Sequence, residues 1–173
     1  MKHVKVQGRG APNDIVEAGD GLKIPAQVTV TAEDVNGYTA ELTARYTAES
    51  GRYEVDWLTV RRGDDGQEVT GEGLRSIPVA AILRDGILSA LSGFTLLQAG
   101  AAPEDLGRSG PTDETLRWVA RVYRFALLVG DAPTQAVASS LDIPRATAAR
   151  WVTRARDRSM LTVSDPRGGG RGG

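Results

Sequence analysis

The spacing of apolar residues changes along this chain, and the change constrains the fold more than any other feature. Residues 38–46 ("YTAELTARY") alternate apolar and polar side chains, which is the period of a half-buried β-strand. Beyond residue 112 the apolar residues recur every three or four positions, which is the period of an α-helix. The sequence therefore predicts an α+β module at 1–99, a Gly- and Pro-rich linker at 100–112, an all-α domain at 113–163 and a glycine-rich tail at 164–173 that is not expected to fold.

The N-terminal module is expected to hold a small antiparallel sheet with a covering helix. Strand patterns occur in residues 22–32, 38–48 and 53–62, and residues 3–7 are a candidate for an added edge strand. We expect Tyr53 and Trp57 to lie in the core, and residues 11–21 to form a loop. The covering helix is predicted over residues 76–94, with an apolar stripe made of Ile77, Ala81, Leu88 and Leu91.

Charge is distributed unevenly between the two parts. Residues 1–111 contain 11 Lys/Arg and 16 Asp/Glu, a net charge of −5, whereas residues 112–173 contain 10 Arg and 6 Asp/Glu, a net charge of +4. A split of this kind suggests that the basic part meets an anionic partner. A chance excess of surface arginine is the alternative interpretation.

The residues that most catalytic and metal sites require are scarce. The chain has no cysteine, and its single histidine is His3, so neither a zinc site nor a Ser-His-Asp triad is expected. Asp64 and Asp65 adjoin glycines in a predicted turn and are expected to be solvated. We therefore predict no enzyme activity, no cofactor and no metal. No apolar run reaches the roughly 20 residues that span a bilayer, and no secretory signal is seen, so a cytoplasmic protein is expected.

Residues 134–153 ("TQAVASSLDIPRATAARWVT") carry most of the functional information. Their apolar spacing predicts two short helices separated by the three residues "DIP", an arrangement typical of the helix-turn-helix motif. The segment resembles the twenty-residue helix-turn-helix signature of bacterial DNA-binding proteins. Its five apolar places and its small place are occupied by Val137, Leu141, Ile143, Ala148 and Trp151, and by Ala138.

Two positions depart from that signature. Asp142 stands where glycine is usual because the turn needs a positive φ, and aspartate tolerates this region better than most residues. Pro144 stands where a capping serine is common, and it presets the first helical turn without a side-chain cap. The wider stretch 122–162 is similar to C-terminal segments of uncharacterised helix-turn-helix proteins of actinobacteria and their phages. The resemblance implies sequence-specific DNA binding.

The outward face of the second helix, residues 145–158, is the predicted reading surface in the major groove. Arg150, and next Arg145, are the best candidates for base contacts, because arginine bonds guanine in a bidentate manner. Four residues are expected to contact phosphates: Thr147, Arg154, Arg156 and Arg158. Thr134 is expected to hold a phosphate at the start of the first helix. The full predicted DNA-binding set is Thr134, Arg145, Ala146, Thr147, Ala149, Arg150, Thr153, Arg154 and Arg158.

These residues favour a transcriptional regulator that binds double-stranded DNA in the nucleoid. A homodimer is expected, because most such proteins gain affinity by pairing on two half-sites. Two alternatives stay open at this point. One is a phage or mobile-element DNA-recognition protein, either a recombination accessory factor or a packaging subunit. The other is a protein-interaction adaptor that uses the basic helix on an acidic partner.

Overall fold

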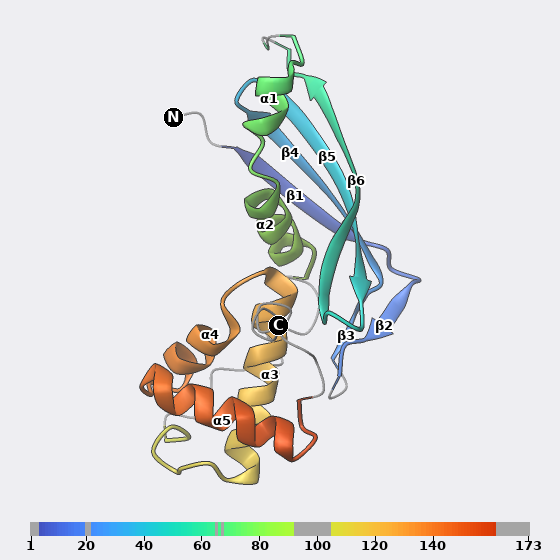
Figure 1. The fold of residues 1–173 in the computed structure, drawn as a ribbon. Helices are drawn as coiled ribbons and strands as arrows, with labels where there is room; N and C mark the ends of the chain where they lie inside the picture. Colours follow the sequence, from blue (N-terminus) through green and yellow to red (C-terminus); the bar gives the residue numbers. More distant parts are fainter. Residues whose placement is uncertain (1–3, 20–21, 65, 67, 92–104, 162–173) are drawn as a thin grey trace, which may run out of the picture. The chain divides into compact units, whose positions relative to one another are not determined.

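The structure is a computed structural model that describes residues 4–19, 22–64, 66, 68–91 and 105–161. These residues form a mixed α/β chain with a four-stranded antiparallel sheet and five helices (Figure 1). The strands are β1 (Lys5–Gly10), β2 (Ile15–Glu17), β3 (Lys23–Pro25), β4 (Gln27–Val35), β5 (Tyr38–Thr47) and β6 (Arg52–Arg62). The helices are α1 (Gly71–Arg75), α2 (Val79–Leu91), α3 (Asp113–Val129), α4 (Pro133–Ser140) and α5 (Arg145–Asp157).

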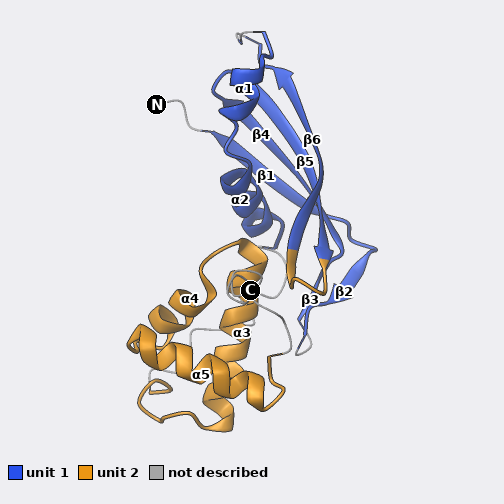
Figure 2. Cartoon of the chain, viewed as in Figure 1, with its two compact units in different colours: residues 1–46, 53–96 blue, residues 47–52, 97–173 orange. Residues whose placement is uncertain are grey.

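The chain divides into two compact units (Figure 2). Unit 1 comprises residues 1–46 and 53–96, and unit 2 comprises residues 47–52 and 97–173. The sheet and α2 lie in unit 1, and α3, α4 and α5 lie in unit 2. The sequence boundaries at 99, 112 and 163 stay predictions, although Leu106, inside the predicted linker, is buried in the core of unit 2.

The sheet of unit 1 has the strand order β1-β4-β5-β6. β1 pairs antiparallel with β4, so the predicted added edge strand is present and extends to Gly10. One face of the two central strands is fully buried, because residues of alternating positions such as Val28, Val30 and Leu42 are all 0% exposed. The alternating pattern of the sequence is thus the pattern of burial in the sheet.

Helix α2 covers this apolar face over β1 and β4 by a close approach of backbones. A Cβ added at Gly86 would lie 2.3 Å from both methyl groups of Val30, and a Cβ added at Gly8 would lie 1.8 Å from the carbonyl oxygen of Gly86. Neither position has room for a side chain. The two glycines therefore let the helix axis lie nearer to the sheet than ordinary side chains permit.

Several local predictions in unit 1 are wrong. The segment expected as a loop contains β2, which pairs with β3 in a separate two-stranded sheet. Ser76 does not begin the covering helix but is the C-cap residue of the short helix α1. Of the expected apolar stripe, Ala81 is exposed and Leu88 is only half-buried. The face that α2 buries consists of Ile82, Gly86, Ile87, Ala90 and Leu91.

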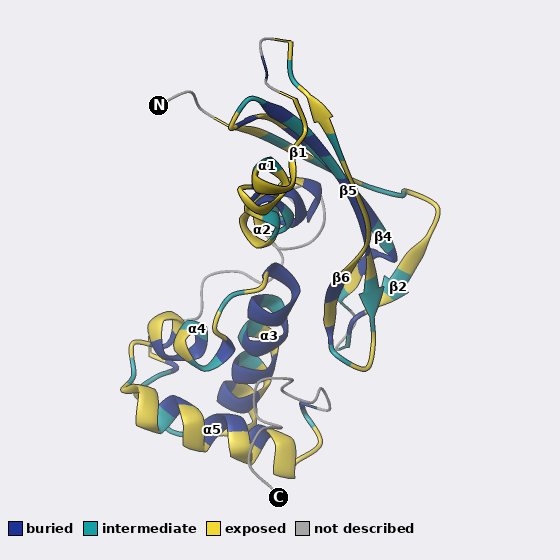
Figure 3. Cartoon of the chain, turned by 45° about the horizontal axis from the view of Figure 1, so that its top comes forward, coloured by how far each residue is buried: buried dark blue, intermediate teal, exposed yellow. Residues whose placement is uncertain are grey.

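Strand β6 differs from the other long strands in its exposure (Figure 3). Tyr53 is buried as expected, and its hydroxyl donates to the carbonyl oxygen of Pro25 at 2.6 Å. Val55, Trp57 and Leu58 are 38%, 45% and 37% exposed. The prediction that Trp57 belongs to the core is therefore wrong.

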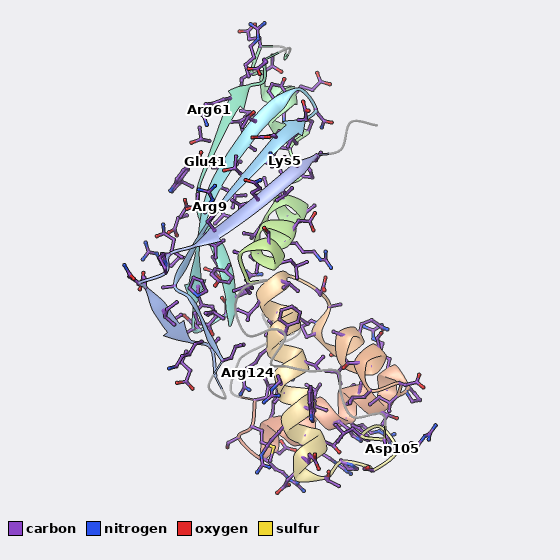
Figure 4. The ribbon with its side chains drawn as sticks, turned by 180° about the vertical axis from the view of Figure 1, so that it is seen from behind. Lys5, Arg9, Glu41, Arg61, Asp105 and Arg124 are labelled. Carbon is purple, nitrogen blue, oxygen red and sulfur yellow. The ribbon has the colours of Figure 1, made fainter. Side chains whose placement is uncertain are left out.

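The face of the sheet away from α2 is polar. Figure 4 shows this face, with Lys5, Arg9, Glu41 and Arg61 among its side chains. Lys5 pairs with Glu33, and Arg61 pairs with Glu41, each at 3.6 Å. These pairs are largely exposed, so each contributes little to stability, at most about 1 kcal/mol.

The three helices of unit 2 all contact one another. Thr112 caps α3 by accepting a hydrogen bond from the Thr115 N–H at 3.2 Å, and Gly130 ends the helix in the left-handed region at φ 78°. Threonine and glycine are favoured residues at these two helix ends, for the side-chain cap and for the positive φ respectively. The core between the helices is formed by residues from every element of the unit, among them Leu106, Leu116, Val119, Tyr123, Leu127, Val137, Leu141, Trp151, Val152 and Leu161.

Candidate nucleic-acid interface

The turn between α4 and α5 spans four residues and has the backbone conformation that the sequence suggested. Asp142 has φ of 49°, in the left-handed region. The N–H of Ile143 donates to the carbonyl oxygen of Ala138 at 3.0 Å, which closes the end of α4. Gly107 packs against this turn, since a Cβ there would lie 2.1 Å from the carbonyl oxygen of Leu141. The segment before α3 therefore packs directly against the backbone of the turn.

The apolar positions of residues 134–153 face the core. Val137 and Ala148 are fully buried, Leu141 and Trp151 are 5% and 6% exposed, and Ile143 is partly buried against the same cluster. Ala138, the small residue, is also buried. Helix α5 therefore has one buried face, which consists of Ala148, Trp151, Val152 and Ala155.

The opposite face of α5 is exposed along its length (Figure 3). Because a helix turns once in 3.6 residues, its exposed residues fall into two adjacent rows. One row holds Arg145, Ala149 and Thr153, and the other holds Ala146, Arg150 and Arg154. All six of these predicted DNA-binding residues are exposed, and the structure brings them together on one surface. We call this set of six residues the α5 face.

The α5 face has short side chains at its centre and arginines at its edges. The guanidinium groups of Arg145 and Arg154 have no hydrogen bond or ion pair with any other residue that the structure describes. Arg150 donates to the hydroxyl of Thr147 at 3.3 Å, and the hydroxyl of Thr153 donates to the carbonyl oxygen of Ala149 at 3.2 Å. Neither bond involves a carboxylate, so no acidic side chain among the described residues is paired with the arginines of this face.

Within α5 the only carboxylate belongs to Asp157, the last residue of the helix. The first helical turn therefore contains no acidic side chain. Pro144 begins the helix without a side-chain hydrogen bond to its first N–H groups. The positive end of the helix dipole therefore adds to the charge of the arginines beside it.

Three further predicted contacts have different surroundings. Arg158, just past α5, is ion-paired with Asp113 at the start of α3. Arg156 donates to the Tyr123 hydroxyl at 2.8 Å, and its guanidinium lies 5.2 Å from the centre of that ring. Thr134 is half-buried in the first turn of α4. Arg156 and Arg158 are thus engaged with α3, which distinguishes them from Arg154.

The role of Arg124, which holds the segment that follows α5, was not predicted from the sequence. Arg124 of α3, labelled in Figure 4, is only 6% exposed and donates to the carbonyl oxygen of Met160 at 2.5 Å. It belongs to the sequence "VYRF", where an arginine adjoins the buried Tyr123. Helical spacing was the available signal: Arg124 lies four residues from Ala120 and from Leu128, which are both buried, and an arginine on a buried face is almost always paired.

The described residues include no group of three or more His, Cys, Asp or Glu side chains placed to hold a metal ion. None of the described helices combines the length and the apolar character needed to cross a membrane. Comparison with known proteins gives no match to a family model, to a curated protein or to a solved structure.

Proposed function

We propose that unit 2 contains a helix-turn-helix domain that binds double-stranded DNA in a sequence-specific manner, with α5 in the major groove. The observation that carries this proposal is the α5 face. It presents three exposed arginines around small side chains, and the opposite side of the same helix is core. A groove-binding helix needs short side chains at its centre so that it can approach the bases, and long cationic side chains beside them that reach base edges or phosphates.

Each part of the α5 face has a proposed role. Arg150 and Arg145 reach base edges, where a bidentate bond to guanine is the commonest specific contact. Ala146 and Ala149 contact thymine methyl groups. Arg154 and the hydroxyls of Thr147 and Thr153 meet phosphates, as does Thr134 at the start of α4. We assign Arg158 chiefly to the ion pair with Asp113, which holds α3 against α5.

The simplest biological role for such a domain is transcriptional regulation in the nucleoid, by a protein that binds as a homodimer to two half-sites. The test is a gel-shift with genomic fragments, followed by selection of the bound sequences. A retarded band at low salt and an enriched sequence are the expected results. Absence of a band at low salt overturns DNA binding and leaves the adaptor role.

A matched pair of variants locates the binding surface. Arg145→Ala and Arg75→Ala each remove one exposed positive charge. Arg145 lies on the α5 face, whereas Arg75 ends α1 in unit 1. Arg145→Ala is expected to weaken binding about tenfold or more, and Arg75→Ala to change it less than twofold. Equal losses in the two variants mean that the attraction is non-specific and that α5 is not the reading helix.

A further inference from the structure

The polar face of the sheet in unit 1 carries a shallow pocket that the proposed DNA binding does not use. The pocket has a volume of about 240 Å³. It is lined by Gln7 and Arg9 of β1, Thr29 and Thr31 of β4, and Glu41 of β5. Arg9 and Glu41 are labelled on this face in Figure 4. The volume is below the roughly 300–1,000 Å³ of sites for drug-sized ligands, so the pocket suits a small molecule.

The strand register explains why a depression forms at this place. Gln7 pairs with Thr31, and Thr31 pairs with Glu41, so these three side chains form one row across the sheet. Arg9 pairs with Thr29 in the next row. Residues directly opposite each other in neighbouring strands share a face. The short, half-buried threonines of β4 therefore lie between longer side chains on both sides and form a floor that offers hydroxyl groups.

The backbone that carries Arg9 is held from the other face of the sheet. Its neighbours Gly8 and Gly10 face the opposite way, because side chains alternate along a strand. A Cβ added at Gly8 would lie 1.8 Å from the carbonyl oxygen of Gly86, and one added at Gly10 would lie 2.2 Å from the Cγ of Pro25. This close packing holds β1 in place, so the side chain of Arg9 extends from a fixed point beside the pocket.

Arg9 differs from its basic neighbours on the sheet, because it has no acidic partner. Three of those neighbours are each paired with a carboxylate, namely Lys5 with Glu33, Arg45 with Asp56 and Arg61 with Glu41. The exposed guanidinium of Arg9 has no hydrogen bond or ion pair with another residue that the structure describes. Its N–H donors and its charge are therefore available to a ligand in the pocket.

The charges around the pocket favour a carboxylate as the ligand. The planar fork of an arginine fits the two oxygens of a carboxylate or of a phosphate. Arg9 supplies one positive charge, and the carboxylate of Glu41, which is paired with Arg61, also lines the pocket. A phosphate group with a charge of about −1.5 to −2 would keep part of its charge unmatched near Glu41. Arg9 neutralises a monocarboxylate completely.

We propose that this pocket binds a small monocarboxylate that also carries a hydroxyl group. The ligand's carboxylate accepts hydrogen bonds from the guanidinium of Arg9 and from the hydroxyl of Thr29, which lies in the same row. The ligand's hydroxyl bonds to the hydroxyl of Thr31, which both donates and accepts. This inference goes beyond the proposed DNA binding and does not rest on it, because the pocket belongs to unit 1.

The test is a titration of the full chain with sodium lactate and with sodium acetate, followed by NMR of the backbone amides and the arginine Nε–H groups. Sodium chloride and sodium phosphate at matched ionic strength are the comparison salts. We expect saturable shifts at Arg9, Thr29 and Thr31 with both carboxylates, and tighter binding of lactate, because only lactate brings a hydroxyl. The proposal is overturned by the absence of saturable shifts with both carboxylates, or by equal shifts with chloride. Tighter binding of phosphate than of lactate overturns the ligand class.

A matched pair of charge variants locates the site. Arg9→Ala and Lys5→Ala each remove one exposed cation from the same face of β1, but Lys5 is not among the residues that line the pocket. Arg9→Ala is expected to weaken lactate binding about tenfold or more, because it removes charge-assisted hydrogen bonds, and Lys5→Ala to change it less than about twofold. Equal losses in the two variants mean that the whole face attracts anions, which contradicts a site at Arg9.

A matched pair of threonine variants tests the floor of the pocket. Thr31→Val removes one hydroxyl and keeps the branched side chain, and Thr39→Val does the same on the polar face outside the pocket. Thr31→Val is expected to abolish the preference for lactate over acetate, whereas Thr39→Val is expected to retain it. The NMR spectra also show that each variant is folded. A preference for lactate that survives Thr31→Val overturns the contact between the ligand's hydroxyl and this floor.

Discussion

Arg158 and Asp113 form an ion pair between the end of α5 and the first turn of α3. The pair joins two helix ends whose dipoles it offsets, because Asp113 lies at a positive end and Arg158 at a negative one. Both side chains are about half exposed or more, so the pair contributes modestly to stability. Its main consequence concerns function, because it separates Arg158 from Arg154, which has no such partner among the described residues.

The first prediction therefore compares these two arginines. Arg154→Ala is expected to reduce the slope of log binding constant against log salt by about one, because it removes one phosphate contact. Arg158→Ala is expected to change that slope by much less and to lower the free energy of unfolding by at most about 1 kcal/mol. Binding titrations at several salt concentrations, with urea unfolding of both variants, measure these effects. The opposite ranking of the salt slopes would assign the phosphate contact to Arg158.

Arg150 is the subject of the second prediction. Among the described residues its exposed guanidinium donates to the neutral hydroxyl of Thr147 and to no carboxylate, so it can turn toward a base. Arg150→Ala is expected to cost about 1–3 kcal/mol of binding free energy and to relax the preference at one base position. Arg150→Lys retains the charge but loses the bidentate bond. It is expected to restore affinity for all sequences while leaving that position unselective, and selection of bound sequences measures this. Unchanged sequence selectivity in both variants would show that Arg150 does not contact a base and that α5 is not the reading helix.

Helix α2 supplies the third prediction. In an isolated helix Gly86→Ala is favourable by about 1 kcal/mol. Here the new methyl would lie 2.3 Å from both methyl groups of Val30, and such overpacking typically costs about 1–3 kcal/mol or more. We expect net destabilisation in thermal and urea unfolding. Adding Val30→Ala is expected to recover part of the loss, and this coupling is the control. Stabilisation by Gly86→Ala would mean that α2 lies farther from the sheet.

Strand β5, helix α2 and strand β6 show how much of the fold the sequence could predict. The alternation in residues 38–46 predicts β5 and its buried face, because the period of a strand is local information. The stripe of α2 was misplaced since Gly86 has no side chain that could mark it as core, although it lies nearest the sheet. The exposure of Trp57 escaped prediction because alternation does not distinguish an edge strand from a central one.

In the candidate site, too, local spacing predicts some features, and other features depend on how the helices pack. The spacing of residues 134–153 predicts the burial of Val137 and Trp151 and the exposure of Arg150. The helical period alone decides which residues of each helix face the core. The partners of Arg156 and Arg158 belong to α3, more than 30 positions earlier in the chain. Whether Arg156 and Arg158 find these partners depends on how α3 packs against α5. The spacing of residues within one segment gives no information about that packing.

The turn residue Asp142 gives the fourth prediction. Its φ of 49° is accessible to aspartate at a steric cost that glycine does not have. Asp142→Gly is expected to raise the free energy of unfolding by about 0.5–1 kcal/mol, whereas Asp142→Val should lower it. Asp142→Asn removes the charge but tolerates the same backbone, so it is expected to match the natural chain. A loss of stability in both the Gly and the Asn variants would show that the carboxylate itself stabilises the turn.

Tyr53 gives the last prediction, which concerns pH. Burial raises the pKa of its phenol far above the ordinary value, with a smaller contribution from Tyr46. The folded state therefore favours the neutral phenol, whose hydroxyl donates to Pro25. This stabilisation is fully present below the unfolded pKa of about 10 and is lost as the pH rises beyond it. Tyr53→Phe is expected to cost about 0.5–1.5 kcal/mol at neutral pH. Because phenylalanine does not titrate, the gap between the two proteins should shrink above about pH 10. Urea unfolding at neutral and alkaline pH measures it, and a gap independent of pH would contradict the burial of this hydroxyl.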